Sequence, residues 1–148
     1  MKNKFIILMV FSFLIILSNY SHALCVNVAE ANLRNGPGTK YEKTWEVFKY
    51  MPFSKQTKKG NWYKVKDVDG DTHWIYRKLV TNKIQCAVVK VDKANIRSGP
   101  GKRYSSNALS PALKYDSFRV LTRKSSWVQV KDEFGDTGWI FRKLLWIQ

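Results

Sequence analysis

The chain has 148 residues and a formal net charge of +15, with only two histidines and two cysteines. Their spacing does not match that of a Cys/His zinc site, which is therefore excluded. A charge this positive favours an anionic partner, such as a polymer, a membrane surface or an acidic protein, although it is equally consistent with a role in solubility alone.

The first 23 residues have the pattern of a secretory signal peptide. Lys2 and Lys4 precede an apolar run over 5–17, and small residues occupy positions 21 and 23. These features predict cleavage after Ala23, export, and a mature protein in the periplasm or outside the cell. Removal of the two lysines would lower the net charge from +15 to +13, and export argues against a nucleic-acid partner.

Two other interpretations of this segment are open. An uncleaved membrane anchor is less favoured, because the apolar run is shorter than the roughly 20 residues that a spanning helix needs. Lipidation of Cys25 is less favoured still, because Leu24 stands where a small residue is expected before a lipidated cysteine. We therefore expect no stable membrane span after cleavage.

The segment after the signal is predicted to form short strands separated by turns. Apolar alternation over 26–33 leads into Asn35-Gly36-Pro37-Gly38, so we expect a strand and then a tight turn in which glycine supplies positive φ. Further strands are expected around 45–48, over 54–67 as a hairpin turning at 59–61, and over 72–80 after a second turn at 69–71.

After a polar connector over 81–85, the chain repeats itself. Ala31–Gly38 returns as Ala94–Gly101, and in both copies a tyrosine follows three residues later, Tyr41 and Tyr104. The offset is 63 residues at this block and 65 at the later ones, so the second copy carries a two-residue insertion near Ser110-Pro111. Such dense self-similarity is stronger evidence for the domain organisation of the chain than any single motif.

The repeat predicts an all-β protein with two tandem small β-barrels, one over 24–82 and the other over 83–148. A unit of about 60 residues buries only roughly 60% of its unfolded surface and is marginal by itself. Cys25 and Cys86 flank the first unit. Because the chain ends of a small barrel usually lie close together, and export favours oxidation, we expect these two cysteines to form a disulfide.

At this point the residues resemble a known family. Asn-x-Arg-x-Gly-Pro, a later Trp-x-x-Val and a closing Gly/His-Trp-Ile occur in the same order twice, and this set is similar to that of the bacterial SH3 (SH3b) domain. The resemblance covers nearly all of the chain after the signal. It implies two small, partly open SH3-like barrels. Such domains are typically non-catalytic, and many of them target enzymes to cell walls or bind peptides and peptidoglycan.

The sequence groups no nucleophile, base and metal ligand together, so we predict no enzyme, no cofactor and no metal. His73 has no partner triad and is replaced by Gly138 in the second copy, which favours a structural or exposed role over a catalytic one. Asp67-x-Asp69-x-Asp71 resembles the start of a calcium loop. Its second copy has Phe134 at the middle position, which favours a hairpin turn instead.

Aromatic side chains are the best candidates for a binding groove. Trp62 and Trp127 alternate with valines along their strands, and the valines are the better core candidates, so the tryptophans are expected to stay partly exposed. Burial of the aromatics in the core is the alternative, and it is the favoured one, because large apolar residues are mostly buried. The candidate groove residues are Tyr41, Trp62, Trp74 and Tyr76 in the first copy, and Tyr104, Trp127, Trp139 and Phe141 in the second.

Arg34 and Arg97 allow two interpretations. Each could clamp a ligand carboxylate through its guanidinium group, or hydrogen-bond the glycine turn internally. The internal role is favoured, because a whole block that is repeated suits a requirement of the fold.

Two functional hypotheses follow. The first is a non-enzymatic envelope module that binds cell-wall polymer or peptides. The second is a protein–protein adaptor, either between envelope proteins or towards a host target. The sequence fixes neither the ligand nor the oligomeric state.

Overall fold

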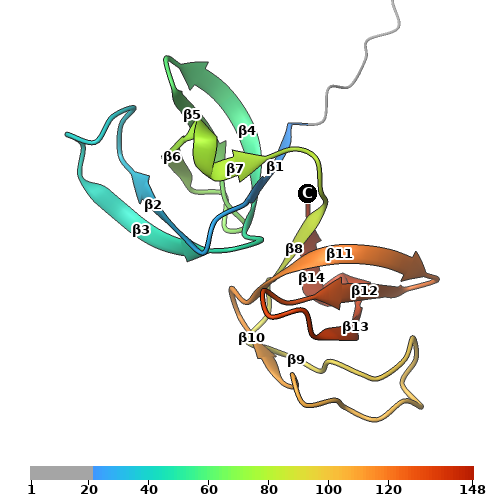
Figure 1. Ribbon diagram of the computed structural model, residues 1–148. Helices are drawn as coiled ribbons and strands as arrows, with labels where there is room; N and C mark the ends of the chain where they lie inside the picture. Colours follow the sequence, from blue (N-terminus) through green and yellow to red (C-terminus); the bar gives the residue numbers. More distant parts are fainter. Residues whose placement is uncertain (1–21) are drawn as a thin grey trace, which may run out of the picture.

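The computed structural model describes residues 22–148, and within this range it contains strands and two 3-10 turns but no α-helix (Figure 1). The all-β prediction is confirmed. Most of the predicted signal, residues 1–21, lies outside the described residues. The part of the chain that the structure describes has no helix with the length and apolar character needed to span a membrane.

The first unit is one antiparallel sheet of seven strands in the order β3-β2-β6-β5-β4-β1-β7. The sheet does not close, because β3 and β7 lie at its two edges. The strands are β1 (Ala23–Val26), β2 (Glu30–Arg34), β3 (Lys43–Phe48), β4 (Pro52–Lys59), β5 (Trp62–Lys66), β6 (Thr72–Tyr76) and β7 (Val80–Thr81).

The second unit has a five-stranded antiparallel sheet in the order β13-β12-β11-β8-β14 and a separate strand pair, β9 with β10. Its strands are β8 (Cys86–Val89), β9 (Lys93–Ala94), β10 (Ala112–Leu113), β11 (Ser117–Lys124), β12 (Trp127–Lys131), β13 (Thr137–Phe141) and β14 (Leu145–Ile147). The boundary between the units after residue 82 stays a prediction.

Each unit has an apolar core, and the core of the first unit also contains Val88 of β8 from the second unit. Val65 of β5 is fully buried in the first core, and Val128 and Val130 of β12 are fully buried in the second. The tryptophans that begin these two strands, Trp62 and Trp127, remain partly exposed. The prediction that the valines of these strands face the core is therefore confirmed.

The end of each repeat differs from the prediction. A single strand over 72–80 was expected, but the 3-10 turn Arg77–Leu79 separates β6 from β7, and Arg142–Leu144 does the same in the second unit. This break redirects the chain, so that β7 pairs with β1 rather than continuing along β5. The predicted hairpin turns are confirmed, with positive φ at Gly60 and Gly70.

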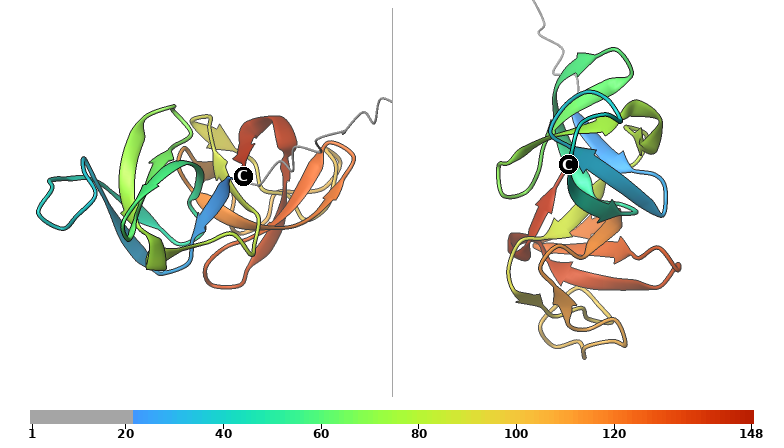
Figure 2. Two further views of the ribbon diagram at one scale, coloured as in Figure 1. Left: turned by 90° about the horizontal axis from the view of Figure 1, so that it is seen from above. Right: turned by 90° about the vertical axis from the view of Figure 1, so that its left-hand side faces the viewer.

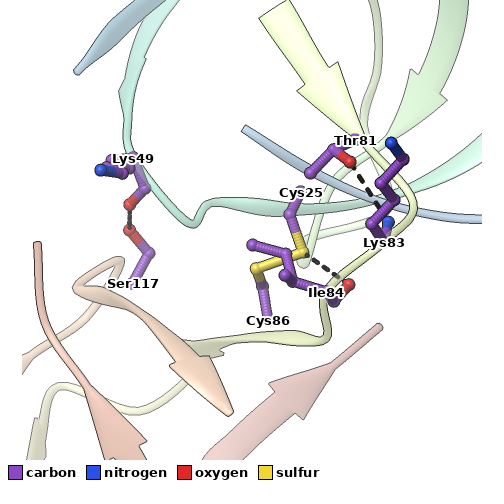
Figure 3. Close-up of a disulfide and its surroundings, with 7 residues drawn as sticks. All are labelled: Cys25, Lys49, Thr81, Lys83, Ile84, Cys86 and Ser117. Carbon is purple, nitrogen blue, oxygen red and sulfur yellow. Dashed lines mark hydrogen bonds between the residues drawn. A yellow bond between two sulfur atoms is a disulfide. The ribbon is translucent and has the colours of Figure 1, made fainter. Parts of the chain in front are cut away.

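The predicted disulfide is confirmed, and it joins the two units. Cys25 lies on β1 and Cys86 on β8, both fully buried, with their Cα atoms 5.9 Å apart. Tyr50 packs against the pair, and the Cys25 Sγ lies 3.4 Å from the Ile84 carbonyl oxygen. Figure 3 shows the bond at the point where the second unit begins.

Further contacts join the two lobes that Figure 2 shows. Tyr115 packs edge-on against Trp45 with ring centroids 5.2 Å apart, and its hydroxyl donates a 2.6 Å hydrogen bond to Asp69. This bond raises the pKa of Tyr115 above its ordinary value. The Ser117 hydroxyl donates to the Lys49 carbonyl at 2.8 Å (Figure 3). The units are thus held together by apolar, polar and covalent contacts.

We predict that the variant Cys25→Ala/Cys86→Ala loses about 4 kcal/mol of unfolding free energy, because a cross-link over 61 residues restricts the unfolded chain. Urea unfolding of the variant and of the oxidised and reduced wild type measures this loss. Reduction should lower the midpoint of the wild type and leave that of the variant unchanged. Identical midpoints for the oxidised and reduced wild type would contradict the prediction.

Candidate binding grooves

The repeated turn is closed by an arginine in both units. The Nη1 atom of Arg34 donates a 2.8 Å hydrogen bond to the Tyr41 carbonyl, and Arg97 makes the same bond, also 2.8 Å, to the Tyr104 carbonyl. The internal role that was favoured for the two arginines is therefore seen in the structure. Each arginine uses one edge of its guanidinium group to join the start of the turn to its end.

The glycines of this turn are required for packing rather than for their backbone conformation. A Cβ atom on Gly36 would fall 2.2 Å from the Tyr41 ring, and one on Gly99 would fall 2.4 Å from the Tyr104 ring. The expectation of positive φ in this turn is wrong, because the glycines with positive φ are Gly60, Gly70 and Gly135. The tyrosine ring lies so close to the backbone that no side chain fits between them.

Beside this turn the first unit has an open groove of about 460 Å³, here called groove one. Its floor and walls come from β2, from the repeated turn, from the start of β5 and from the end of β6. The residues that line it are Glu30, Ala31, Asn32, Arg34, Gly38, Thr39, Trp62, Tyr76 and Leu79.

The second unit has a groove of about 380 Å³ at the corresponding place, here called groove two. Its lining residues are Lys93, Asn95, Arg97, Lys102, Trp127, Phe141 and Leu144. Every one of these residues corresponds, at the repeat offset of 63 or 65, to a residue of groove one. The chain therefore builds the same hollow twice.

A tilted aromatic pair forms one wall of each groove. Trp62 and Tyr76 lie 5.6 Å apart between ring centroids with an interplanar angle of 51°, and the corresponding values for Trp127 and Phe141 are 5.6 Å and 52°. In each pair the two residues lie directly opposite each other on adjacent antiparallel strands. Cross-strand aromatic pairs stabilise a sheet, and because these rings are partly exposed their surfaces are also open to a ligand.

The structure divides the predicted site residues into two groups. Arg34, Trp62 and Tyr76 meet in groove one, and their counterparts Arg97, Trp127 and Phe141 meet in groove two. The other four candidates belong to the closed turn or lie across from it: Tyr41, Tyr104, Trp74 and Trp139. Whether any of these residues binds a ligand stays a prediction.

Sequence reasoning missed some lining residues. Asn32 and Asn95 bring a side-chain amide to each groove, and Leu79 and Leu144 bring an apolar side chain from the 3-10 turn. The asparagines belong to the repeated block itself, so the repeat could have identified them as candidates. The leucines could not be placed without the break between β6 and β7.

The predicted hairpin turn at 67–71 is confirmed, and the Asp67 carboxylate organises it. Its Oδ1 accepts hydrogen bonds from the backbone N–H of Asp69 at 3.0 Å and of Asp71 at 2.9 Å. Its Oδ2 lies 2.8 Å from His73 Nε2, and His73 Nδ1 lies 3.0 Å from the Thr44 hydroxyl. Over residues 22–148 no three His, Cys, Asp or Glu side chains are grouped so that they could hold a metal ion.

Comparison with known proteins gives matches to both units. Models of the bacterial SH3 domain match residues 27–82 and 92–145. A curated relative from Bacillus subtilis (strain 168), named "Putative N-acetylmuramoyl-L-alanine amidase YrvJ", is 26% identical over 121 residues, or 75% of this chain. The chain spans only 23% of the length of that relative.

Two solved structures also align with the chain. An NlpC/P60 family protein from Bacillus cereus ATCC 10987 is 13% identical with a TM-score of 0.39, over 85% of this chain and 56% of that one. A structure titled "Endolysin LysPBC5 CBD" is 16% identical with a TM-score of 0.35, over 85% of this chain and 93% of that one.

We predict that Gly36→Ala and Gly99→Ala each lower the unfolding free energy by about 1–3 kcal/mol, because the new methyl group must displace a packed tyrosine ring. Gly38→Ala and Gly101→Ala are the matched controls. A Cβ atom there lies 3.5 Å from the same rings, which is ordinary contact, so changes of less than about 0.5 kcal/mol are expected. Chemical denaturation measures all four, and equal losses at both glycines of a turn would refute the packing explanation.

Proposed function

Because the chain belongs to the bacterial SH3 domain family, with one copy over 27–82 and another over 92–145, we propose that it is an exported, non-catalytic module that binds peptidoglycan in the cell envelope. The observation that carries this proposal is the groove that both copies build from equivalent residues. Two equivalent hollows on one chain suit a ligand that is itself a repeating polymer, because one polymer can occupy both of them.

The chemistry of the grooves suits a polymer of sugars and peptides. The partly exposed faces of Trp62 and Trp127 offer apolar surfaces on which a sugar ring or an apolar side chain can stack. Asn32 and Asn95 each bring an amide that can both donate and accept hydrogen bonds, as peptide groups and acetamido groups require.

The curated relative supports the same class of ligand. Its name gives N-acetylmuramoyl-L-alanine as the unit on which it acts, and such a unit combines an acetylated amino sugar with an amino acid. The net charge of +13 that remains after removal of the predicted signal and its two lysines adds long-range attraction to a polymer that bears carboxylates. Two weak sites that engage one polymer strengthen each other without new contacts.

We predict that the full chain pellets with purified insoluble peptidoglycan at low salt, and that Trp62→Ala/Trp127→Ala reduces its apparent affinity at least tenfold. The reason is that an aromatic anchor at the centre of a binding site typically contributes 2 kcal/mol or more (about thirtyfold). Bound fraction against peptidoglycan concentration gives the affinity, and thermal unfolding verifies that the variant is folded.

Phe134→Ser is the matched control, since it removes an aromatic side chain that is 85% exposed and lines neither groove. It should pellet like the wild type. Absence of pelleting by the folded wild type at low salt would rule out the wall-binding function. Pelleting that is unaffected by the double tryptophan variant would rule out the grooves as the site.

A second candidate function is that of a protein–protein adaptor, and a different surface favours it. Phe134 and Phe48, which are 85% and 50% exposed, lie around a cavity of about 310 Å³ that both units line. Asp116, Asp132 and Glu133 line the same cavity. Exposed apolar side chains gathered at one place commonly mark protein contacts, and the acidic rim suits a partner with basic residues.

If the adaptor function holds, affinity capture from an envelope fraction should recover one dominant protein. Phe134→Ser should lose that protein, while Trp62→Ala/Trp127→Ala should retain it, because the tryptophans lie outside the acidic cavity. Mass spectrometry of the captured material measures both. Equal recovery by Phe134→Ser and the wild type would exclude this surface as the contact.

A further inference from the structure

The two grooves share a framework but differ in charge at their rims. Glu30, at the start of β2, corresponds to Lys93 at the start of β9, and Thr39 in the first turn corresponds to Lys102 in the second. All four residues line their grooves and are exposed. The repeat therefore keeps the aromatic pair, the asparagine and the arginine, and changes the ionic groups around them.

The change alters the formal charge of the lining residues. In groove one the Glu30 carboxylate offsets the Arg34 guanidinium, so the lining is neutral overall. In groove two Lys93, Arg97 and Lys102 are all cationic, and no acidic residue lines the groove. Within residues 22–148 neither Lys93 nor Lys102 forms an ion pair. Both ammonium groups are therefore available to a ligand.

The position of these groups determines what they can recognise. The Nη1 atom of Arg97 already donates a hydrogen bond to the Tyr104 carbonyl. The two lysines, in contrast, carry compact charges on flexible stems. An anionic group that sits beside the Trp127 and Phe141 rings would be within the field of both lysines. The same anion in groove one would instead meet Glu30, and like charges at close range disfavour binding.

We infer that the two grooves are not interchangeable: groove two binds the part of the wall polymer that carries a free carboxylate, and groove one binds a part that is neutral or carries an amine. This inference rests on the proposed function and assigns each groove its own ligand class. The difference between the grooves fixes the orientation in which the chain binds along the polymer, since the opposite orientation would place the carboxylate beside Glu30.

The experiment titrates the ¹⁵N-labelled full chain with an acetylmuramoyl peptide that ends in a free carboxylate, and separately with its C-terminal amide. The indole N–H signals of Trp62 and Trp127 report on the two grooves independently, and Trp→Phe variants assign them. The free acid should shift the Trp127 signal at about tenfold lower concentration than the Trp62 signal. The amide should remove most of that difference, because each lost exposed ion pair changes affinity up to about fivefold.

Variants test the rim directly. Lys93→Glu/Lys102→Thr, which copies the rim of groove one, should weaken binding of the acid at Trp127 about tenfold, and Glu30→Lys/Thr39→Lys should strengthen it at Trp62. Lys58→Glu/Lys66→Thr makes the same change in net charge at exposed residues that line neither groove. It should leave the ratio of the two affinities unchanged.

The outcomes separate the inference from the function beneath it. Equal affinities of both grooves for acid and amide, with no effect of the rim variants, would overturn the inference and leave peptidoglycan binding standing. The same conclusion would follow if neither peptide shifted either indole signal while the chain still pelleted with whole peptidoglycan. Loss of pelleting as well would overturn the proposed function itself.

Discussion

The contact between a tyrosine ring and a bare glycine is the constraint on which the rest of each unit depends. Tyr41 lies over Gly36, and the Arg34 guanidinium reaches across the same turn to the Tyr41 carbonyl. The two contacts hold the loop between β2 and β3 in one conformation, although sheet hydrogen bonds are absent along most of this loop. Gly38 and Thr39 of this loop form a wall of groove one. The groove therefore exists only as long as the turn stays closed.

The second constraint is the small size of each unit, and contacts at the junction between the units compensate for it. Tyr50 and Tyr115 occupy equivalent positions, and both have positive φ, 70° and 75°, a conformation that non-glycine residues rarely adopt. The same turn thus presents a tyrosine from each unit towards the junction. Tyr50 packs on the disulfide and Tyr115 packs on Trp45. Each unit in this way supplies apolar cover that the other lacks, which a marginal domain of this size needs.

Much of this could be predicted from the sequence, because the repeat compares each residue with its own counterpart. The buried valines beside the tryptophans, the hairpin turns and the disulfide follow from alternation, glycine position and cysteine count. The pairing of Trp62 with Tyr76 does not, since it depends on the register between β5 and β6. Nor could the role of Gly36 be predicted, because a glycine in the sequence does not reveal whether φ or a neighbouring ring requires it.

The comparison of the two grooves also separates what the fold requires from what a ligand requires. Arg34 and Arg97 keep identical hydrogen bonds of 2.8 Å, and the aromatic pairs keep the same centroid distance of 5.6 Å. A fold requirement constrains these groups in both copies, whatever binds there. Glu30 and Lys93 are exposed and hold no part of the framework, so the fold tolerates either charge. Ligand choice is the property that such positions can change without disturbing the turn. The ionic differences between the grooves therefore belong to the rims, while the aromatic pair differs by the exchange of Tyr76 for Phe141.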